Sequence, residues 1–151
     1  DYLVEDKVTL HEKHNIVYRD ITKAGGGLGF SNSIPEDADF KEKIFMHPTI
    51  LFRYSAIGFV GHRIHYDQPY SVNEENYKDL IVHGPLQATY LLRAAEKLTG
   101  KTVKSFSHRV MAPVFANSEY IVGAKQNDDG SVSCWGATES AGVTMKAEAK
   151  F

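Results

Sequence analysis

An apolar helix pattern constrains the fold of this chain more than any other feature. It begins at Gly84-Pro85, ends near Leu98, and repeats its apolar side chains at three- and four-residue spacings. These side chains are Leu86, Tyr90, Leu91, Ala94, Ala95 and Leu98. Proline suits the first helical position, because a helix cannot use the N–H there, and Gly100 is a suitable residue for the helix end. Such a helix has one apolar face, which another layer of structure must cover.

Segments of alternating apolar and polar residues follow this helix and predict that layer. Their apolar or small members are Val103, Phe106, Val110 and Val114, then Tyr120, Val122 and Ala124, then Val132, Cys134 and Gly136, then Val143, Met145 and Ala147. Asn127 to Gly130 indicates a hairpin turn, because Asp-Gly tolerates positive φ values. At least three antiparallel strands after one helix, without repeated strand-helix alternation, predict an α+β fold with an antiparallel sheet packed on that helix.

The chain before the helix is expected to hold two short strands and a linker. Val8 to Ile21 is rich in β-branched and aromatic residues, and so is Thr49 to Tyr54, so both ranges predict strands. The glycine-rich run from Ala24 to Gly29, with the polar stretch up to Lys43, indicates a linker. A phosphate-binding loop is the alternative, but it needs a Gly-Lys-Ser/Thr ending or a later acidic residue after a strand-to-helix turn.

Composition narrows the classes of function. Of 151 residues, 42% are hydrophobic and 24% charged, which is typical of a globular domain. The 17 basic and 19 acidic residues nearly balance, which argues against nucleic acid or a membrane surface as the partner. No apolar run approaches the roughly 20 residues of a membrane-spanning helix. The single cysteine, Cys134, predicts no intrachain disulfide and a reducing compartment. We therefore expect a cytoplasmic protein, or a mitochondrial matrix protein if the source is eukaryotic.

The densest cluster of ionisable side chains runs from His62 to Asp67, and Gln68 to Tyr70 is expected to close it as a turn. His62 and His65 have the spacing i, i+3. They lack the further ligands of a tetrahedral zinc site, so no metal is expected. Acid-base catalysis is a second interpretation, because imidazole exchanges protons near neutral pH. A solvated loop with structural histidines is the third.

The junction between Val82 and Pro85 delivers the chain into the helix. Backbone N–H groups at such a start are unpaired and favour negative charge. Since Gly84 has no side chain, a carbonyl oxygen can approach its N–H closely. Gly84 is therefore a candidate oxyanion donor, although a glycine needed only for the turn fits the same pattern. An imidazole and an oxyanion donor together suit chemistry that forms an enolate.

Three segments resemble one known family. Phe52-Arg53-Tyr54-Ser55-Ala56, His62-Arg63-Ile64-His65-Tyr66-Asp67 and Leu80-Ile81-Val82-His83-Gly84-Pro85-Leu86 are similar to the hot-dog hydratases and dehydratases of the MaoC type. The nearest branch comprises type 2 hydroxyacyl-thioester dehydratases and mesaconyl- or itaconyl-CoA hydratases. The resemblance implies a sheet wrapped around a central helix. It also implies reversible addition of water to the α,β double bond of a thioester of coenzyme A or acyl carrier protein, with no separate cofactor.

By this resemblance, His65 matches the catalytic histidine and Gly84 matches the glycine whose N–H binds the thioester carbonyl. The wider family places an aspartate five positions before the histidine, and the nearer branch usually has threonine and asparagine where this chain has Gly58 and Val60. Valine cannot orient water or carry a proton. His62 is the nearest substitute.

Three further residues are expected at the substrate. His83 directly precedes Gly84 and is expected to contact the bound thioester. Arg63 and Arg109 are candidates for contacts to phosphates of the carrier, although an exposed arginine is commonly just solvated.

Some members of the family carry two hot-dog halves in one polypeptide. The resemblance therefore implies that residues 1–21 hold a strand of a preceding half, residues 22–48 a linker, and residues 49–151 a hot-dog domain. The expected partner is a second copy or a separate first-half chain. Two alternatives stay open: a hot-dog thioesterase, which would need a carboxylate such as Asp67, Asp79 or Glu96, and a non-catalytic thioester-binding half, which Val60 favours.

Overall fold

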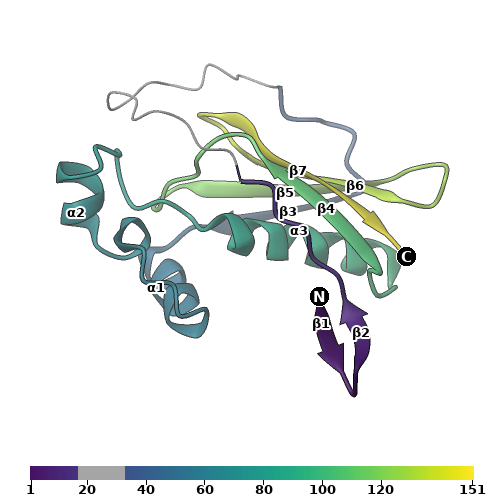
Figure 1. Cartoon of the computed structure of the whole chain (residues 1–151). Coiled ribbons are helices and arrows are strands. Elements are labelled where there is room, and N and C mark those ends of the chain that lie inside the picture. Colours follow the sequence, from purple (N-terminus) through teal and green to yellow (C-terminus); the bar gives the residue numbers. More distant parts are fainter. Residues whose placement is uncertain (17–32) are drawn as a thin grey trace.

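One long helix and one antiparallel sheet form the centre of the molecule. The computed structural model describes residues 1–16 and 33–151. Helix α3 (Gly84–Thr99) lies against one face of a five-stranded sheet of order β3-β5-β6-β7-β4 (Figure 1). The strands are β3 (Phe40–Phe45), β4 (Ser105–Val110), β5 (Glu119–Gln126), β6 (Val132–Thr138) and β7 (Gly142–Lys150). All four pairings are antiparallel, which confirms the predicted α+β arrangement.

Helix α3 has the ends and the buried face that its pattern predicts. It begins at Gly84, and Gly100 ends it in the left-handed conformation, with φ of 68°. Leu91 and Ala95 are fully buried on the helix, as are Val132 and Met145 on the sheet. Burial of each large aliphatic side chain contributes about 1.5–3 kcal/mol to stability. The core that holds the sheet on the helix is therefore the one indicated by the apolar periodicity.

The turn between β5 and β6 also agrees with the sequence. Asn127 and Ser131 pair across it, with the Asn127 N–H donating to the Ser131 carbonyl at 2.9 Å. Gly130 has a φ of 81°, which confirms the Asp-Gly turn.

Helix α1 (Pro48–Ile57) occupies the range in which we expected a strand at Thr49 to Tyr54. That prediction was wrong. The His47 side chain caps the helix by accepting a hydrogen bond from the Thr49 N–H at 3.2 Å, and Pro48 follows at the first helical position. The cap therefore overrides the strand preference of the β-branched and aromatic residues.

Strand β3 lies inside the range 22–48 that we expected to be a linker. The expectation was wrong for residues 40–45, which pair with β5. Phe40 and Ile44 are half-buried, whereas Lys41 and Lys43 between them are exposed, so the segment has the period of an edge strand. Its charged residues suit an unpaired sheet edge, where they discourage strand addition. Residues 22–32 lie outside the described residues.

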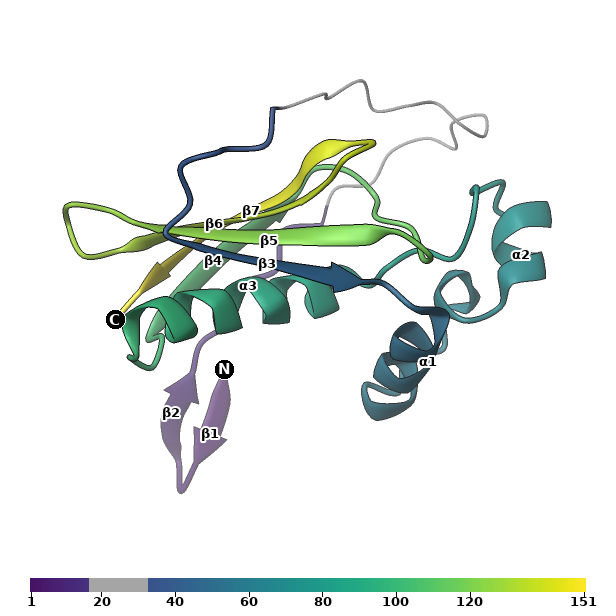
Figure 2. The ribbon, with the colours of Figure 1, turned by 180° about the vertical axis from the view of Figure 1, so that it is seen from behind.

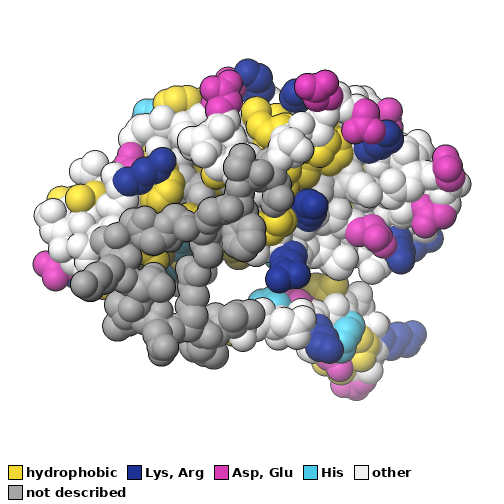
Figure 3. Space-filling view, turned by 90° about the horizontal axis from the view of Figure 1, so that it is seen from above, with side chains coloured by type: hydrophobic (Ala, Val, Ile, Leu, Met, Phe, Trp, Pro, Cys, Tyr) yellow, Lys and Arg dark blue, Asp and Glu magenta, His cyan; other side chains and the backbone are white. Residues whose placement is uncertain are grey.

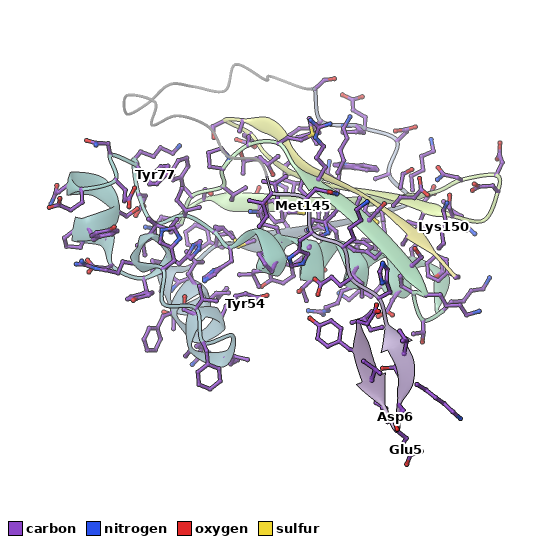
Figure 4. All side chains as sticks on the ribbon, viewed as in Figure 1. Glu5, Asp6, Tyr54, Tyr77, Met145 and Lys150 are labelled. Carbon is purple, nitrogen blue, oxygen red and sulfur yellow. The ribbon has the colours of Figure 1, made fainter. Side chains whose placement is uncertain are left out.

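The N-terminal residues form a hairpin of their own. Strands β1 (Tyr2–Val4) and β2 (Lys7–Leu10) pair as a separate two-stranded sheet. Glu5 and Asp6 form its turn with φ values of 49° and 62°, and they lie at the tip that points away from the rest of the chain (Figure 4). The strand expected from Val8 to Ile21 therefore ends at Leu10, and residues 17–21 lie outside the described residues.

The shorter helices gather at one end of the molecule. Figure 2 shows α1 and α2 (Gln68–Asn73) at the end of the sheet where α3 begins. Figure 3 looks onto the sheet face opposite α3, where hydrophobic side chains lie between charged ones. Within residues 1–16 and 33–151, no helix has the length and apolar character needed to cross a membrane.

Two glycines let large aromatic rings lie flat on the sheet. A Cβ atom at Gly123 would overlap the Trp135 ring of the neighbouring strand, and one at Gly136 would overlap the Tyr120 hydroxyl. Tyr120 is fully buried and Trp135 is 6% exposed, so neither ring can move into solvent without leaving the core. These glycines are required for space and not for backbone conformation.

We expect Gly136→Ala to destabilise the fold. The added methyl group must displace a buried tyrosine, and such overpacking costs about 1–3 kcal/mol. Gly61→Ala is the matched control, because a Cβ there meets no atom within 4 Å. The free energy of unfolding from urea titrations checks both variants. Equal midpoints for Gly136→Ala and wild type would show that the Tyr120 packing tolerates the methyl group.

Candidate active site

The site forms where the turn after α1 meets the start of α3. A 3₁₀ helix, η1 (Arg63–His65), follows α1, and then α2 replaces the simple turn expected at Gln68 to Tyr70. Ile81 anchors η1, because its N–H donates to the Ile64 carbonyl at 2.9 Å. Ile81 also forms a β-bridge with Phe115. These contacts bring the end of η1 beside the residues that precede α3.

The His65 ring is held in one protonation pattern. Its Nδ1 lies 2.7 Å from the Ile81 carbonyl oxygen. Because a carbonyl oxygen only accepts, Nδ1 carries the hydrogen, and Nε2 of the neutral ring has a free lone pair. Burial lowers the pKa of His65, and the nearby His62 acts in the same direction, whereas the hydrogen bond to Ile81 opposes them. At neutral pH, His65 therefore offers an unprotonated Nε2, as a general base must.

The structure places His83 directly against His65. The two rings stack with centroids 3.8 Å apart and planes inclined by 19°. His83 is only 2% exposed, and its Nε2 lies 2.8 Å from the Ser55 hydroxyl oxygen. Burial, with a smaller contribution from His65, lowers the pKa of His83 to about 4. His83 is therefore an uncharged, buried ring at neutral pH.

Gly84 occupies the first position of α3, where the helix provides no acceptor for its N–H. A Cβ at Gly84 would meet only Val110, at 3.5 Å, which is an ordinary contact. Packing therefore does not require glycine here, and the bare backbone leaves the approach to the N–H open. The partial positive charge at the helix start favours a developing oxyanion. Because His65 stacks on the residue before Gly84, the base and this N–H lie at the same helix start.

His62 and Arg63 lie on the solvent side of the cluster. The exposed His62 ring meets His65 edge-on, with centroids 5.6 Å apart. Arg63 binds Asp67 through Nε and Nη2 at 3.0 and 2.8 Å, and its guanidinium lies 4.1 Å from the centre of the Tyr70 ring. This pairing raises the pKa of Arg63 and lowers that of Asp67. Arg63 thus borders a surface hollow of about 350 Å³ beside α2.

Arg109 lies elsewhere. Val110 faces Gly84, and successive side chains of a strand point to opposite faces, so Arg109 points to the sheet face away from α3. In the strand register, Arg109 of β4 lies opposite Lys146 of β7. The structure therefore does not bring Arg109 to the histidine pair.

The three carboxylates considered for a thioesterase all have structural partners. Asp67 caps α2 through the Tyr70 N–H at 3.1 Å. Asp79 accepts from the Leu80 N–H at 2.8 Å, and Glu96 accepts from the Val103 N–H at 3.1 Å. Each carboxylate therefore has a role in fixing the backbone.

The apolar substitution noted in the sequence lies in the loop between α1 and η1. Val60 donates its N–H to the Ser55 carbonyl at 2.9 Å, which ties the loop to the buried end of α1. A Cβ at Gly58 would lie 3.3 Å from a Val60 methyl carbon. Gly58 and Val60 thus fit each other, and a larger residue at position 58 would crowd the valine.

Sequence reasoning missed the residues that support the two histidines. Tyr54 was expected to end a strand, yet it and Ser55 both lie on α1, and Tyr54 is marked in Figure 4. The Tyr54 ring lies 4.9 Å from that of His83. The sequence feature that could have indicated this helix is the i, i+4 spacing of Leu51 and Ser55, which are its buried residues. The Ile81 carbonyl has no signature in a sequence, because every residue has one.

The arrangement can transfer a proton at Nε2 of His65 and stabilise negative charge at the Gly84 N–H. In the part of the chain that the structure describes, no three His, Cys, Asp or Glu side chains are grouped as metal ligands. The chemistry offered by these residues is acid-base chemistry beside an oxyanion donor.

Comparisons with known proteins agree with this arrangement. The chain is 35% identical over 127 residues to the mesaconyl-C(4)-CoA hydratase of Chloroflexus aurantiacus, covering 82% of this chain and 44% of that protein. The chain therefore spans less than half the length of this relative.

Solved structures share the fold. A MaoC-like dehydratase from Phytophthora capsici matches with a TM-score of 0.66 and 22% identity, over 79% of this chain and 42% of that chain. A chain of the ChsH1–ChsH2 complex from Mycobacterium tuberculosis matches with a TM-score of 0.61 and 18% identity, over 73% and 90% of the two chains. These likenesses confirm the hot-dog fold implied by the resemblance.

The family model described as hydroxyacyl-thioester dehydratase type 2 matches residues 1–116, which include α1, η1 and α3. With this match over most of its length, the chain belongs to the hydroxyacyl-thioester dehydratase type 2 family.

Proposed function

We propose that this chain adds water reversibly to enoyl thioesters, or removes it from 3-hydroxyacyl thioesters. The supporting observation is the His65 ring, which donates Nδ1–H to Ile81 and leaves Nε2 free beside the start of α3. The family and the name of the Chloroflexus relative support the same reaction. Coenzyme A or acyl carrier protein is the proposed carrier of the thioester, and no other cofactor takes part.

In the hydration direction, Nε2 of His65 takes a proton from water, and the water oxygen bonds to the β-carbon. The double-bond electrons move toward the thioester carbonyl, whose oxygen becomes negative. The N–H of Gly84 donates a hydrogen bond to that oxygen, and one such donor stabilises a transition state by about 2.7–4 kcal/mol. The imidazolium then returns its proton to the α-carbon, which restores neutral His65. Dehydration follows the same steps in reverse.

His62 is the proposed helper in place of the missing polar residue. Val60 has no hydrogen-bonding side chain with which to hold water. His62 is exposed, and its ring lies edge-on to His65 at 5.6 Å, so it can exchange protons with solvent next to the base. Arg63 remains a proposed contact for phosphates of the carrier. Arg109 can make such a contact only if the carrier reaches the sheet face away from α3. A substrate contact by His83 stays an expectation from the sequence, because its side chain is only 2% exposed.

Val60 also supports the second candidate, a non-catalytic half that binds acyl thioesters. A thioesterase has less support, because Asp67, Asp79 and Glu96 all fix backbone N–H groups.

A second hot-dog unit is the proposed partner, either another copy of this chain or a separate chain. The relative in Chloroflexus is more than twice as long as the matched region, and the ChsH1–ChsH2 structure is a complex. The chain also exposes apolar side chains on the N-terminal hairpin and on α1 and the loop after it. These are Tyr2, Leu3, Val4, Val8, Leu10, Phe52, Ile57 and Phe59. Exposed apolar surfaces of this kind, one on the hairpin and one on α1 and the loop after it, are typical of interfaces. The cytoplasmic location stays a prediction.

We expect His65→Ala to lower kcat for hydration of crotonyl-, mesaconyl- or itaconyl-CoA by ~10²- to 10⁴-fold, because a general base contributes that much to the rate. Absorbance of the conjugated thioester measures the rate. His108→Ala is the control, since His108 is an exposed histidine on β4. Equal rates for His65→Ala and wild type would remove His65 from the mechanism.

The role of Val60 can be tested by restoring a polar side chain. We expect Val60→Asn to raise kcat at least about tenfold, a value below the usual range for acid-base groups. If His62 is the helper, His62→Ala should lower kcat in wild type but much less in Val60→Asn. Val60→Ala is the control for loss of the methyl groups. No gain from asparagine, together with no activity in wild type, would favour the non-catalytic half.

We expect light scattering to give at least twice the mass of one chain, because exposed apolar surface is typically buried in an interface. Ser replacements at Phe52 and Phe59 should shift the mass toward one chain. A wild-type protein that stays monomeric at every concentration would contradict the proposed pairing with a second copy and leave a separate chain as the partner to be sought by co-expression.

A further inference from the structure

The His65 ring has two contacts of different kinds. The hydrogen bond from Nδ1 to the Ile81 carbonyl fixes one atom of the ring. This hydrogen bond alone does not prevent the ring from turning about its Cβ–Cγ bond, which would break the hydrogen bond and move Nε2. The His83 ring, stacked at 3.8 Å and nearly parallel, blocks that rotation from one face. Together, the two contacts give Nε2 a single direction.

His83 is itself held from several sides. Its Nε2 lies at hydrogen-bond distance, 2.8 Å, from the Ser55 hydroxyl oxygen, and the Tyr54 ring packs against it at 4.9 Å. Its carbonyl accepts the Gln87 N–H at 3.2 Å, which is part of the start of α3. The ring therefore cannot shift without disturbing both α1 and α3.

His83 is poorly suited to proton transfer. It is 2% exposed, and its low pKa keeps it uncharged at neutral pH. Two titratable groups face it, His65 from η1 and Tyr54 from α1, while His62 lies against His65. A rigid neutral ring in this place can act only through the ring beside it.

We propose that His83, anchored by Ser55, is a positioning residue that holds the plane of the His65 ring. This rests on the proposed function, in which His65 Nε2 takes the proton from water. It gives the buried histidine a role other than the substrate contact expected from the sequence. The flat face of His83 matters in this role, and its nitrogens matter only through the bond to Ser55.

Two double variants distinguish the effect of the flat face of the His83 ring from the effect of its nitrogens. Ser55→Ala/His83→Phe and Ser55→Ala/His83→Leu both remove the two hydrogen-bonding partners together, which avoids leaving one of them unpaired. Only phenylalanine keeps a flat ring against His65. We expect the Phe variant to keep kcat within about threefold of wild type. The Leu variant should lose ~10²-fold, the typical effect of a misplaced catalytic group. KM should stay within about threefold in both, because the proposed role involves no contact with substrate.

A second measurement does not depend on activity. Nitrogen-15 NMR of the histidine rings in the full chain should show wild-type His65 as one tautomer, with hydrogen on Nδ1. The Leu variant should show a mixture, and the Phe variant should resemble wild type. If wild type proves inactive on every thioester, the proposed function fails, yet the tautomers still test the positioning role.

Ser55→Ala alone covers the case in which the double variants do not fold, as judged by circular dichroism. It should lower kcat by up to about tenfold, the value of one hydrogen bond, and broaden the His65 signals. His108→Leu is the matched control and should change neither readout. Equal kcat and equal tautomers in the Phe and Leu variants would overturn the proposal. So would a rise in KM at unchanged kcat, which would instead identify His83 as a substrate contact.

Discussion

The backbone of Ile81 is the contact on which the site depends. Its N–H donates to the carbonyl of Ile64, and its carbonyl accepts from the ring of His65, so the backbone of one residue fixes two neighbouring residues of η1. The next residue extends this attachment, because the Val82 N–H donates to the carbonyl of Val114, in the segment between β4 and β5, at 2.8 Å. A loop that would otherwise be loosely placed is thereby fixed to the start of α3. The protonation pattern of His65 follows from the same bond.

Local patterns predicted the elements whose own residues determine them. Helix α3 was predicted because its apolar residues repeat within four positions and Gly100 can adopt a positive φ. The hairpin at Gly130 was predicted for a similar reason. Helix α1 was missed because a capping contact from His47 outweighs the strand preference of its residues. Strand β3 was missed because its lysines face solvent at a sheet edge, where a strand has the composition of a loop.

The residues of the candidate site fall into the same two groups, those indicated by local sequence and those determined by packing. His65 and Gly84 were found through short motifs that resemble a family, and each motif is continuous in the sequence. The stack of His65 on His83 and the bond to Ser55 join residues as many as 28 positions apart. Such contacts depend on how three elements pack, and no spacing in a single sequence indicates them. The same limit applies to Arg109, since only strand register shows which face of the sheet it occupies.

The ring of Trp135 lying over Gly123 has a practical consequence. It is the only tryptophan of the chain, and it sits on β6, in the middle of the sheet. Its fluorescence therefore reports whether the sheet is assembled, while the histidine cluster lies at the start of α3 and contributes no indole. A built-in spectroscopic signal thus separates loss of the whole fold from a local change at the site, without any added label.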